Sequence, residues 1–147
     1  MKVAIADIFD LDIAAGLFDQ YRVFYGKASD PEGARRFLSE RLIHQQSVVL
    51  LARDDAGAAV GFVQLYPTYS SVSMRKKFIL NDLFVEPAAR KSGVAAALLE
   101  EARRVAAQCG ALALTLSTAV DNHAARHLYE SNGWELDADY LNFEFSL

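Results

Sequence analysis

One stretch of the chain decides how its fold can be interpreted: Val85-Glu86-Pro87-Ala88-Ala89-Arg90-Lys91-Ser92-Gly93-Val94-Ala95. The preceding residues 78–85 (FILNDLFV) predict a strand, and Pro87 ends it because proline has no backbone N–H for a strand ladder. Residues 93–108 carry an apolar stripe at helical spacing, so a helix is expected to begin at this point. Glycine and small residues at a helix start expose several backbone N–H groups, and these suit a pyrophosphate. Arg90 and Lys91 add positive charge beside them, although an ordinary turn is the other interpretation of the stretch alone.

The remaining elements extend outward from this junction. Before it we expect a strand at 3–6, a helix at 14–25, a helix opened by Asp30 and Pro31, and strands at 47–53 and 58–66 joined by a turn at 54–57. Residues 68–77 look like a polar connection. After the junction we expect a strand at 112–116, a helix at 122–132, and strands near Trp134 and at 140–145. The order predicts a mixed α/β fold in a single domain over residues 1–147.

Composition narrows the class of protein. Apolar residues make up 52% of the 147 residues and charged residues 23%, which is typical of an ordered globular fold. No apolar run approaches the about 18 residues that a membrane span needs. The net charge of −4 argues against nucleic-acid binding, which depends on many Lys and Arg contacts to phosphate. Cys109 is the one cysteine, so no internal disulfide is expected, and a cytoplasmic location fits.

A second pattern runs from Asn122 to Trp134. Asn122 is placed to cap a helix, and Tyr129 lies two turns further along the same side. Together with the first stretch this resembles the GNAT superfamily of N-acetyltransferases. The loop of that family reads Arg/Gln-x-x-Gly-x-Gly/Ala, which residues 90–95 match. Its second half typically reads Asn-x-x-Ala-x-x-x-Tyr-x-x-x-Gly-Phe, which residues 122–134 match with Trp134 in the last place.

The resemblance implies a fold and a cofactor. It implies a mixed, mostly antiparallel sheet with splayed central strands flanked by helices, and acetyl-CoA as the acetyl donor. The residues it implies for acetyl-CoA binding are Leu83, Phe84, Val85, Arg90, Lys91, Ser92, Gly93, Val94, Ala95, Ala96, Asn122 and Ala125. Backbone groups of residues 83–85 are expected to bind pantetheine and the thioester oxygen, and those of 91–96 the pyrophosphate.

The resemblance also implies two catalytic residues. An amine of the lysine type has a pKa of about 10.4 and must lose a proton before it attacks the acetyl carbon. Tyr129 occupies the general-acid position of the family, and Asp82 is our candidate to orient or deprotonate the amine. Cys109 lacks the electropositive setting of a reactive thiolate, so we expect no acetyl-cysteine. His123 and His127 lie four residues apart, but no third ligand is evident and no metal is expected.

Within the superfamily, residues 61–69 and 81–85 look like the diamine and polyamine acetyltransferase branch. That branch usually carries Glu-Asp where this chain has Asn81-Asp82, and the preceding loop here ends in a basic run at 75–77. We therefore expect a small primary amine (a diamine, polyamine or amino-acid-like compound), with Asn81, Asp82 and Tyr25 contacting it. A protein or peptide lysine and a non-catalytic acyl-CoA-binding module are the alternatives. The apolar strand expected around Phe143 and Phe145 would suit a homodimer.

Overall fold

The computed structural model describes residues 1–147, whose contacts form two compact units, Met1–Ser117 and Thr118–Leu147. Each unit is described by itself. That all 147 residues form one domain stays a prediction. None of the helices combines the length and the apolar character that crossing a membrane requires.

The first unit is built on a five-stranded sheet in the order β1-β2-β3-β4-β5. The strands are β1 (Lys2–Ile5), β2 (Val48–Arg53), β3 (Ala59–Ser70), β4 (Arg75–Val85) and β5 (Leu114–Thr115). The first four pair antiparallel with their neighbours, and β4 pairs with β5 in parallel. The prediction of a mixed, mostly antiparallel sheet is therefore confirmed.

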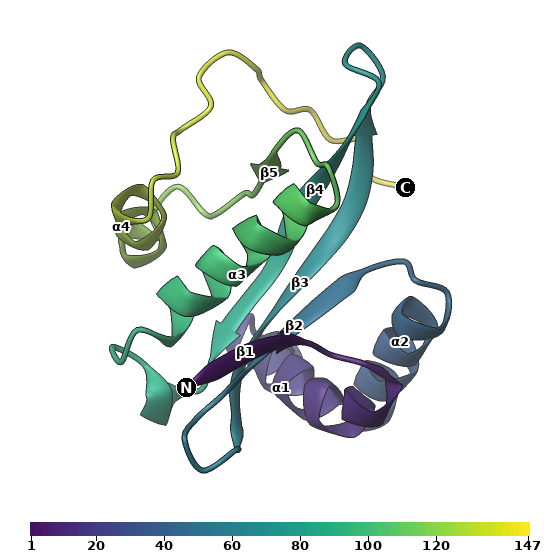
Figure 1. Cartoon of the computed structure of the whole chain (residues 1–147), viewed down its shortest axis with the longest axis vertical. Coiled ribbons are helices and arrows are strands. Elements are labelled where there is room, and N and C mark those ends of the chain that lie inside the picture. Colours follow the sequence, from purple (N-terminus) through teal and green to yellow (C-terminus); the bar gives the residue numbers. More distant parts are fainter. The chain divides into compact units, whose positions relative to one another are not determined.

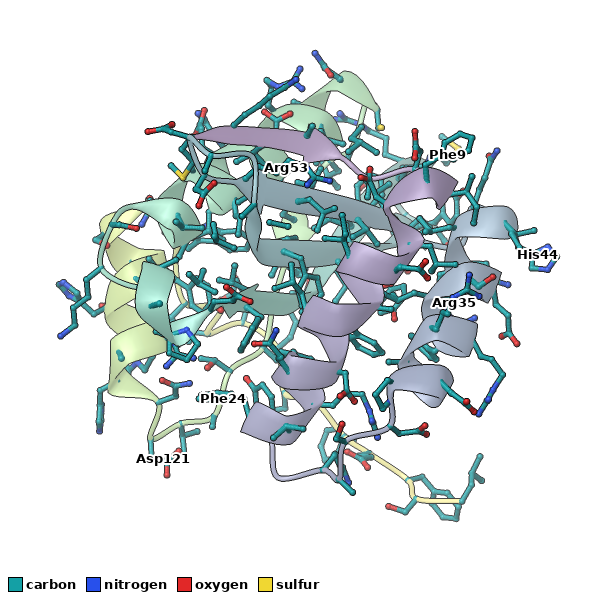
Figure 2. All side chains as sticks on the ribbon, turned by 90° about the horizontal axis from the view of Figure 1, so that it is seen from below. Phe9, Phe24, Arg35, His44, Arg53 and Asp121 are labelled. Carbon is teal, nitrogen blue, oxygen red and sulfur yellow. The ribbon has the colours of Figure 1, made fainter.

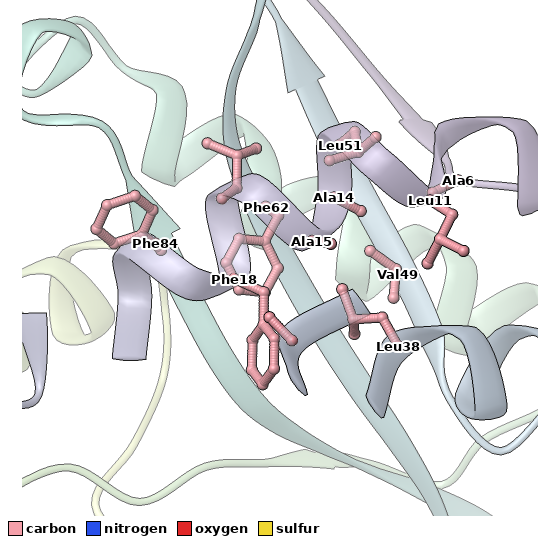
Figure 3. Packing of buried hydrophobic residues seen from close by; sticks show 12 residues of the cluster. Ala6, Leu11, Ala14, Ala15, Phe18, Leu38, Val49, Leu51, Phe62 and Phe84 are labelled. Carbon is pink, nitrogen blue, oxygen red and sulfur yellow. The ribbon is translucent and has the colours of Figure 1, made fainter. Parts of the chain in front are cut away.

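Three helices cover the two faces of this sheet (Figure 1). Helices α1 (Leu11–Phe24) and α2 (Pro31–Ile43) lie on one face, and α3 (Val94–Gln108) crosses the other. Under α1 and α2 the core joins Phe18 and Leu38 to Val49, Phe62 and Phe84 of the strands (Figure 3). The helix starts follow the sequence signals: the Asp30 carboxylate accepts the Gly33 N–H at 2.9 Å, and Pro31 is the first residue of α2.

The polar connection expected at residues 68–77 is wrong in extent. β3 continues to Ser70 and β4 begins at Arg75, with Thr68 opposite Lys77 and Tyr69 opposite Lys76. Hairpin strands tolerate polar side chains where a face meets water, and Thr and Tyr favour extended backbone. The turn is therefore confined to residues 71–74.

A side-chain pairing expected on α3 is also different. The four-residue spacing of Glu100 and Arg104 predicts an ion pair between them, but Glu100 binds Arg103 and Glu101 binds Arg104. Neighbours three residues apart are equally accessible on a helix surface, so the spacing alone does not choose between them.

The second unit contains one helix, α4 (His123–Ser131), and no strand. The strands expected near Trp134 and at 140–145 are absent from it. Leu141, Phe143 and Phe145 keep the alternation that is typical of a strand, but a strand also needs a ladder partner, and this unit offers none.

Candidate active site

The second half of β4 has an open edge. β5 pairs with β4 only at Phe78 and Ile79, whereas β4 continues to Val85. From Leu80 onward, β4 therefore has β3 on one side and no strand on the other. Leu83, Phe84 and Val85 lie along this edge, so the structure brings these three predicted residues together beside an unpaired stretch of backbone.

The loop that follows β4 turns the chain into α3. A single 3₁₀ turn, Pro87–Ala89, is followed by Lys91 at φ 61° and Gly93 at φ 84°. Gly93 is the N-cap of α3, where a left-handed backbone favours glycine. The first N–H to bond inside the helix is that of Ala97, to the Gly93 carbonyl at 3.0 Å.

The N–H groups of Val94, Ala95 and Ala96 therefore precede the first helical hydrogen bond, as the first donors of any helix do. The first turn of α3 carries no acidic side chain, and no atom lies within 4 Å of a Cβ built on Gly93. Open donors without a competing carboxylate fit the diphosphate of a coenzyme A molecule.

Two side chains of this loop are engaged within the protein. Arg90 Nε donates to the Val85 carbonyl at 3.0 Å, and its guanidinium lies 5.4 Å from the ring centre of Phe24. Ser92 Oγ donates to the Ala89 carbonyl at 2.7 Å. In this structure both side chains brace the loop, and Lys91 extends an exposed, unpaired ammonium from it.

Asp82 is a buried carboxylate on the face of the sheet that α1 and α2 cover. Its side chain lies opposite Gln64 of β3 and is 3% exposed. Gln64 Nε2 donates to Asp82 Oδ2 at 2.6 Å, and Asn81 Nδ2 donates to Asp82 Oδ1 at 3.0 Å. Burial of a carboxylate is costly unless such donors accompany it, so the site is built to hold this charge.

A half-buried phenol adjoins this carboxylate. Burial is the largest cause that raises the pKa of Tyr66, and the negative charge of Asp82 raises it further. Arg41 of α2 acts in the opposite direction, through its charge and a hydrogen bond to the phenol. The Arg41 guanidinium also lies 3.9 Å from the ring centre of Phe37.

Aromatic side chains line the end of α1. Phe24 lies at the last turn of the helix (Figure 2). Phe24 and Tyr25, which follows it, are each 60% exposed. Tyr21 packs edge-on against Phe62 and Phe84 at 5.8 and 6.5 Å between ring centres. Only Tyr21 therefore joins the core, and Tyr25 is left with an accessible ring.

The second unit holds the other predicted residues. Asn122 caps α4, because its Oδ1 accepts the Ala125 N–H at 3.1 Å. The capping prediction is confirmed, and the Asn122 amide N–H₂ is the part of that side chain the cap does not use. Tyr129 packs against Trp134 with 6.0 Å between ring centres. His123 and His127 are exposed, and no three His, Cys, Asp or Glu side chains of the chain gather as metal ligands.

Sequence reasoning missed the polar partners of Asp82. Gln64 binds Asp82 and Ser47 binds Gln64, and both lie far from Asp82 in the sequence. A signal was available, because Gln64 is the one polar side chain inside the apolar run VGFVQLY at 60–66. A buried amide in an apolar strand needs hydrogen-bond partners, which Ser47 and Asp82 supply.

A separate hollow of about 360 Å³ lies at the other end of the sheet. Ser47, Lys76, Phe78, Val105 and Cys109 are among its lining residues. It contains none of the residues predicted for the active site, and among the lining residues named here Ser47 is connected to Asp82, through Gln64.

Comparison with known proteins agrees with this geometry. The model of the acetyltransferase (GNAT) family matches residues 14–134. The chain is 48% identical to the uncharacterized N-acetyltransferase YhfO of Bacillus subtilis (strain 168), over 97% of this chain and 95% of the relative. It is 31% identical to a probable acetyltransferase of Haemophilus influenzae, over 100% of this chain and 99% of the relative.

A solved structure is also similar. The crystal structure of a probable acetyltransferase superposes with a TM-score of 0.96 at 40% identity, covering 100% of this chain and 98% of that one. The open edge of β4, the donors at the start of α3 and these relatives agree, and the chain therefore belongs to the acetyltransferase (GNAT) family and is an acetyl-CoA-dependent N-acetyltransferase.

Proposed function

We propose that this enzyme acetylates a primary amine of a small molecule by direct attack, with Asp82 as proton acceptor and Tyr129 as general acid. The observation that carries the proposal is the burial of a hydrogen-bonded carboxylate, Asp82, within the open edge of β4 and directly before Leu83. A carboxylate in that position attracts a cationic amine to the place where the acyl group is held.

Acetyl-CoA supplies the acetyl group as a thioester. Backbone N–H groups of residues 91–96 hold its diphosphate, and backbone groups of Leu83, Phe84 and Val85 align the pantetheine arm and the thioester carbonyl along β4. Asn122 and Ala125 complete the binding of the arm. Asn81 and Tyr25 contact the acceptor amine.

The proton balance assigns one residue to each end of the reaction. Asp82 takes a proton from the ammonium form of the acceptor, directly or through water, and frees the nitrogen lone pair. The nitrogen then bonds to the acetyl carbon, the C–S bond breaks, and the nitrogen gives up its second proton to solvent, to which Asp82 also passes on the first. Tyr129 donates its phenolic proton to the departing thiolate, and solvent returns the proton that Tyr129 has given up.

The acceptor class follows from the charges near Asp82. One carboxylate stands there, with Asn81 beside it, and Arg41 reaches the same region through Tyr66. This balance favours a monoamine, a diamine or an amino-acid-like compound over a long polycation. Release of the CoA thiol should be measured across diamines, polyamines, amino acids and lysine peptides. Turnover with a small amine supports the proposal, whereas turnover with lysine peptides alone would replace it with a protein acetyltransferase.

Two substitutions test the assigned roles. Tyr129→Phe should lower turnover steeply while acetyl-CoA binding is kept, and Tyr140→Phe is the control because that ring is 78% exposed. Asp82→Asn keeps the shape but cannot accept the proton, and Asp12→Asn at an exposed ion pair with Arg35 is its control. Wild-type rates in Tyr129→Phe or Asp82→Asn would remove that residue from the mechanism.

Two features of the whole protein belong to the same proposal. A cytoplasmic location is supported by the unpaired thiol of Cys109. A homodimer is supported by the exposed, alternating side chains of Leu141, Phe143 and Phe145. Light scattering on the purified enzyme tests the dimer, and a monomer at working concentration would refute it.

A further inference from the structure

A chain of buried polar side chains crosses three strands and ends on Asp82. Ser47, just before β2, donates its hydroxyl to Gln64 Oε1 at 2.8 Å, and Gln64 Nε2 donates to Asp82 Oδ2 at 2.6 Å. Gln64 is fully buried, and Ser47 is 8% exposed. No buried side-chain nitrogen or oxygen of the protein lacks a hydrogen-bond partner, and this includes the polar atoms of Ser47, Gln64 and Asp82.

Only one assignment of donors and acceptors is consistent with these hydrogen bonds. An ionised carboxylate accepts hydrogen bonds and donates none, so the Gln64 amide must present its N–H₂ to Asp82. Its carbonyl then faces Ser47, whose hydroxyl can donate to it. The carboxylate of Asp82 therefore determines the orientation of the Gln64 amide, and Ser47 supplies the donor that holds the carbonyl at its other end.

A β-bulge brings the carboxylate to this network. Gln64 is opposite Asp82, but its neighbour Leu65 is opposite Leu80, so Asn81 is an extra residue in β4. Strict alternation would place residues 80 and 82 on the same face of the sheet. The extra residue instead turns Asp82 toward Gln64, and β-bulges commonly re-aim a side chain in this way beside active sites.

We propose that Gln64 and Ser47 are positioning residues that hold Asp82 charged and aim its Oδ1 at the acceptor amine. This inference rests on the proposed role of Asp82 as proton acceptor. Oδ2 is turned into the core by Gln64, whereas Oδ1 is turned toward Asn81, which is exposed. Oδ1 is thus the oxygen that an amine can approach, and the proton that leaves nitrogen forms its new O–H bond there.

The other charged and titratable groups around Asp82 act in a different pH range. Burial and the charge of Asp82 raise the pKa of Tyr66 of β3 above the ordinary phenol value, and the Arg41 guanidinium of α2 lies beside that phenol. Tyr21 of α1 reaches the neighbouring Phe84 with its ring. Two phenols and a guanidinium do not titrate in acid, so the acidic limb of a pH–rate profile does not report them.

A purely structural polar pair would give a different result from a positioning pair. If Gln64 and Ser47 only join the strands, replacing them lowers stability and rate while the shape of the pH profile is unchanged. If they hold the charge of Asp82, their loss makes the carboxylate easier to protonate and moves the acidic limb of kcat/KM upward. The free amine contributes equally to every variant, so differences between the profiles arise from the enzyme.

The experiment compares Gln64→Met, Ser47→Ala and Ser47→Thr with the wild type across pH, using the best amine from the panel. We expect the acidic limb of Gln64→Met to move to higher pH, because the carboxylate loses a hydrogen bond that favours its charged form. Ser47→Ala should move it less, because the amide can then rotate, and Ser47→Thr should restore it by keeping the hydroxyl. Gln20→Met is the matched control, since Gln20 donates to Glu86 on the surface at 3.2 Å.

Profiles of Gln64→Met and Ser47→Ala that superimpose on the wild type after scaling would overturn the inference. If Gln64→Met does not fold, the comparison of Ser47→Ala with Ser47→Thr still decides it. Asp82→Asn separates the proposed role of Asp82 as proton acceptor from the positioning role of Gln64 and Ser47. A wild-type rate in Asp82→Asn would refute the role of Asp82 itself, whereas an inactive Asp82→Asn with an unmoved limb in Gln64→Met would refute only the positioning role.

Discussion

Gly61 lies at the closest approach between β3, β4 and α3, and replacing it with alanine tests how tightly the acetyl-CoA end of the sheet is packed. Gly61 is opposite Val85 in the ladder. A Cβ at this position would lie 2.8 Å from the Phe84 carbonyl oxygen, and 3.3 Å from both Leu98 Cδ1 and Val85 Cγ2. The two side chains can rotate away, but the carbonyl is fixed in the backbone of β4. The added methyl must therefore push β4 away from β3.

The expected magnitude follows from two opposing effects. Overpacking of this kind costs about 1–3 kcal/mol of the free energy of unfolding. Replacing glycine with alanine returns about 0.4–1 kcal/mol by restricting the unfolded chain. The net loss should be about 1–2 kcal/mol, which lowers Tm by roughly 3–8 °C for a chain of this size.

Gly16 provides a control with the same chemical change and the opposite sign. It lies inside α1, and a Cβ built on it meets nothing within 4 Å. Gly16→Ala should raise the free energy of unfolding by about 0.5–1 kcal/mol, the helix preference of alanine over glycine. Urea denaturation of both variants measures the difference, and titration with acetyl-CoA tests whether Gly61→Ala also weakens binding along β4. A Gly61→Ala enzyme at least as stable as Gly16→Ala would refute the close-approach reasoning.

Two further predictions concern backbone strain and a buried charge. Gly93→Ala places a Cβ on a backbone at φ 84°, so it should lower the free energy of unfolding by about 1–2 kcal/mol and raise the KM for acetyl-CoA. Gly57→Ala, at φ 88° in the β2–β3 turn, is the control: it should lower the free energy of unfolding by the same amount and leave the KM unchanged. The pKa of Asp19 is lowered mainly by a hydrogen bond from the Ser29 hydroxyl and next by one from the Asp30 N–H. The ionised carboxylate therefore contributes its full stabilisation of the fold above the ordinary pKa of about 4, and this contribution is lost as the pH falls below that value. Asp19→Asn should therefore lower the free energy of unfolding in urea at pH 7 by about 1–2 kcal/mol, and the gap from the wild type should close toward pH 3. A gap independent of pH would contradict the ionic origin.

The parts of the fold that could be predicted from the sequence are those fixed by neighbours in the chain. Asp30 and Pro31 start α2, Asn122 caps α4, and Gly93 sits at the start of α3, because each signal acts on backbone a few residues away. The loop proposed to bind acetyl-CoA is recognisable for the same reason. The chemistry proposed for it uses consecutive N–H groups, and these appear in the sequence as one continuous motif.

The parts that could not be predicted depend on residues distant in the chain. Ser70 and Arg75 delimit the hairpin turn only because β3 and β4 pair along their full length, and polar side chains there hide the strand pattern. The alternation at residues 141–147 shows the opposite error, since a strand pattern without a ladder partner gives no strand. The role proposed for Gln64 depends on the strand register, which places it opposite Asp82 and cannot be seen in the sequence.

The register of β4 also explains why one strand can carry most of the reaction. Its pairing with β5 ends at Ile79, its extra residue follows at Asn81, and the next residue is the buried carboxylate. The end of the β5 pairing and the bulge thus lie within two residues of each other. Asp82, on the face of α1, therefore directly precedes the backbone of residues 83–85, which is proposed to bind the thioester. A shift of the bulge by one position would return residue 82 to the face of α3 and separate the proton acceptor from the acyl group. The proposed chemistry therefore depends on the position of the bulge at Asn81. It depends less on the identity of any one side chain in the loop between β4 and α3.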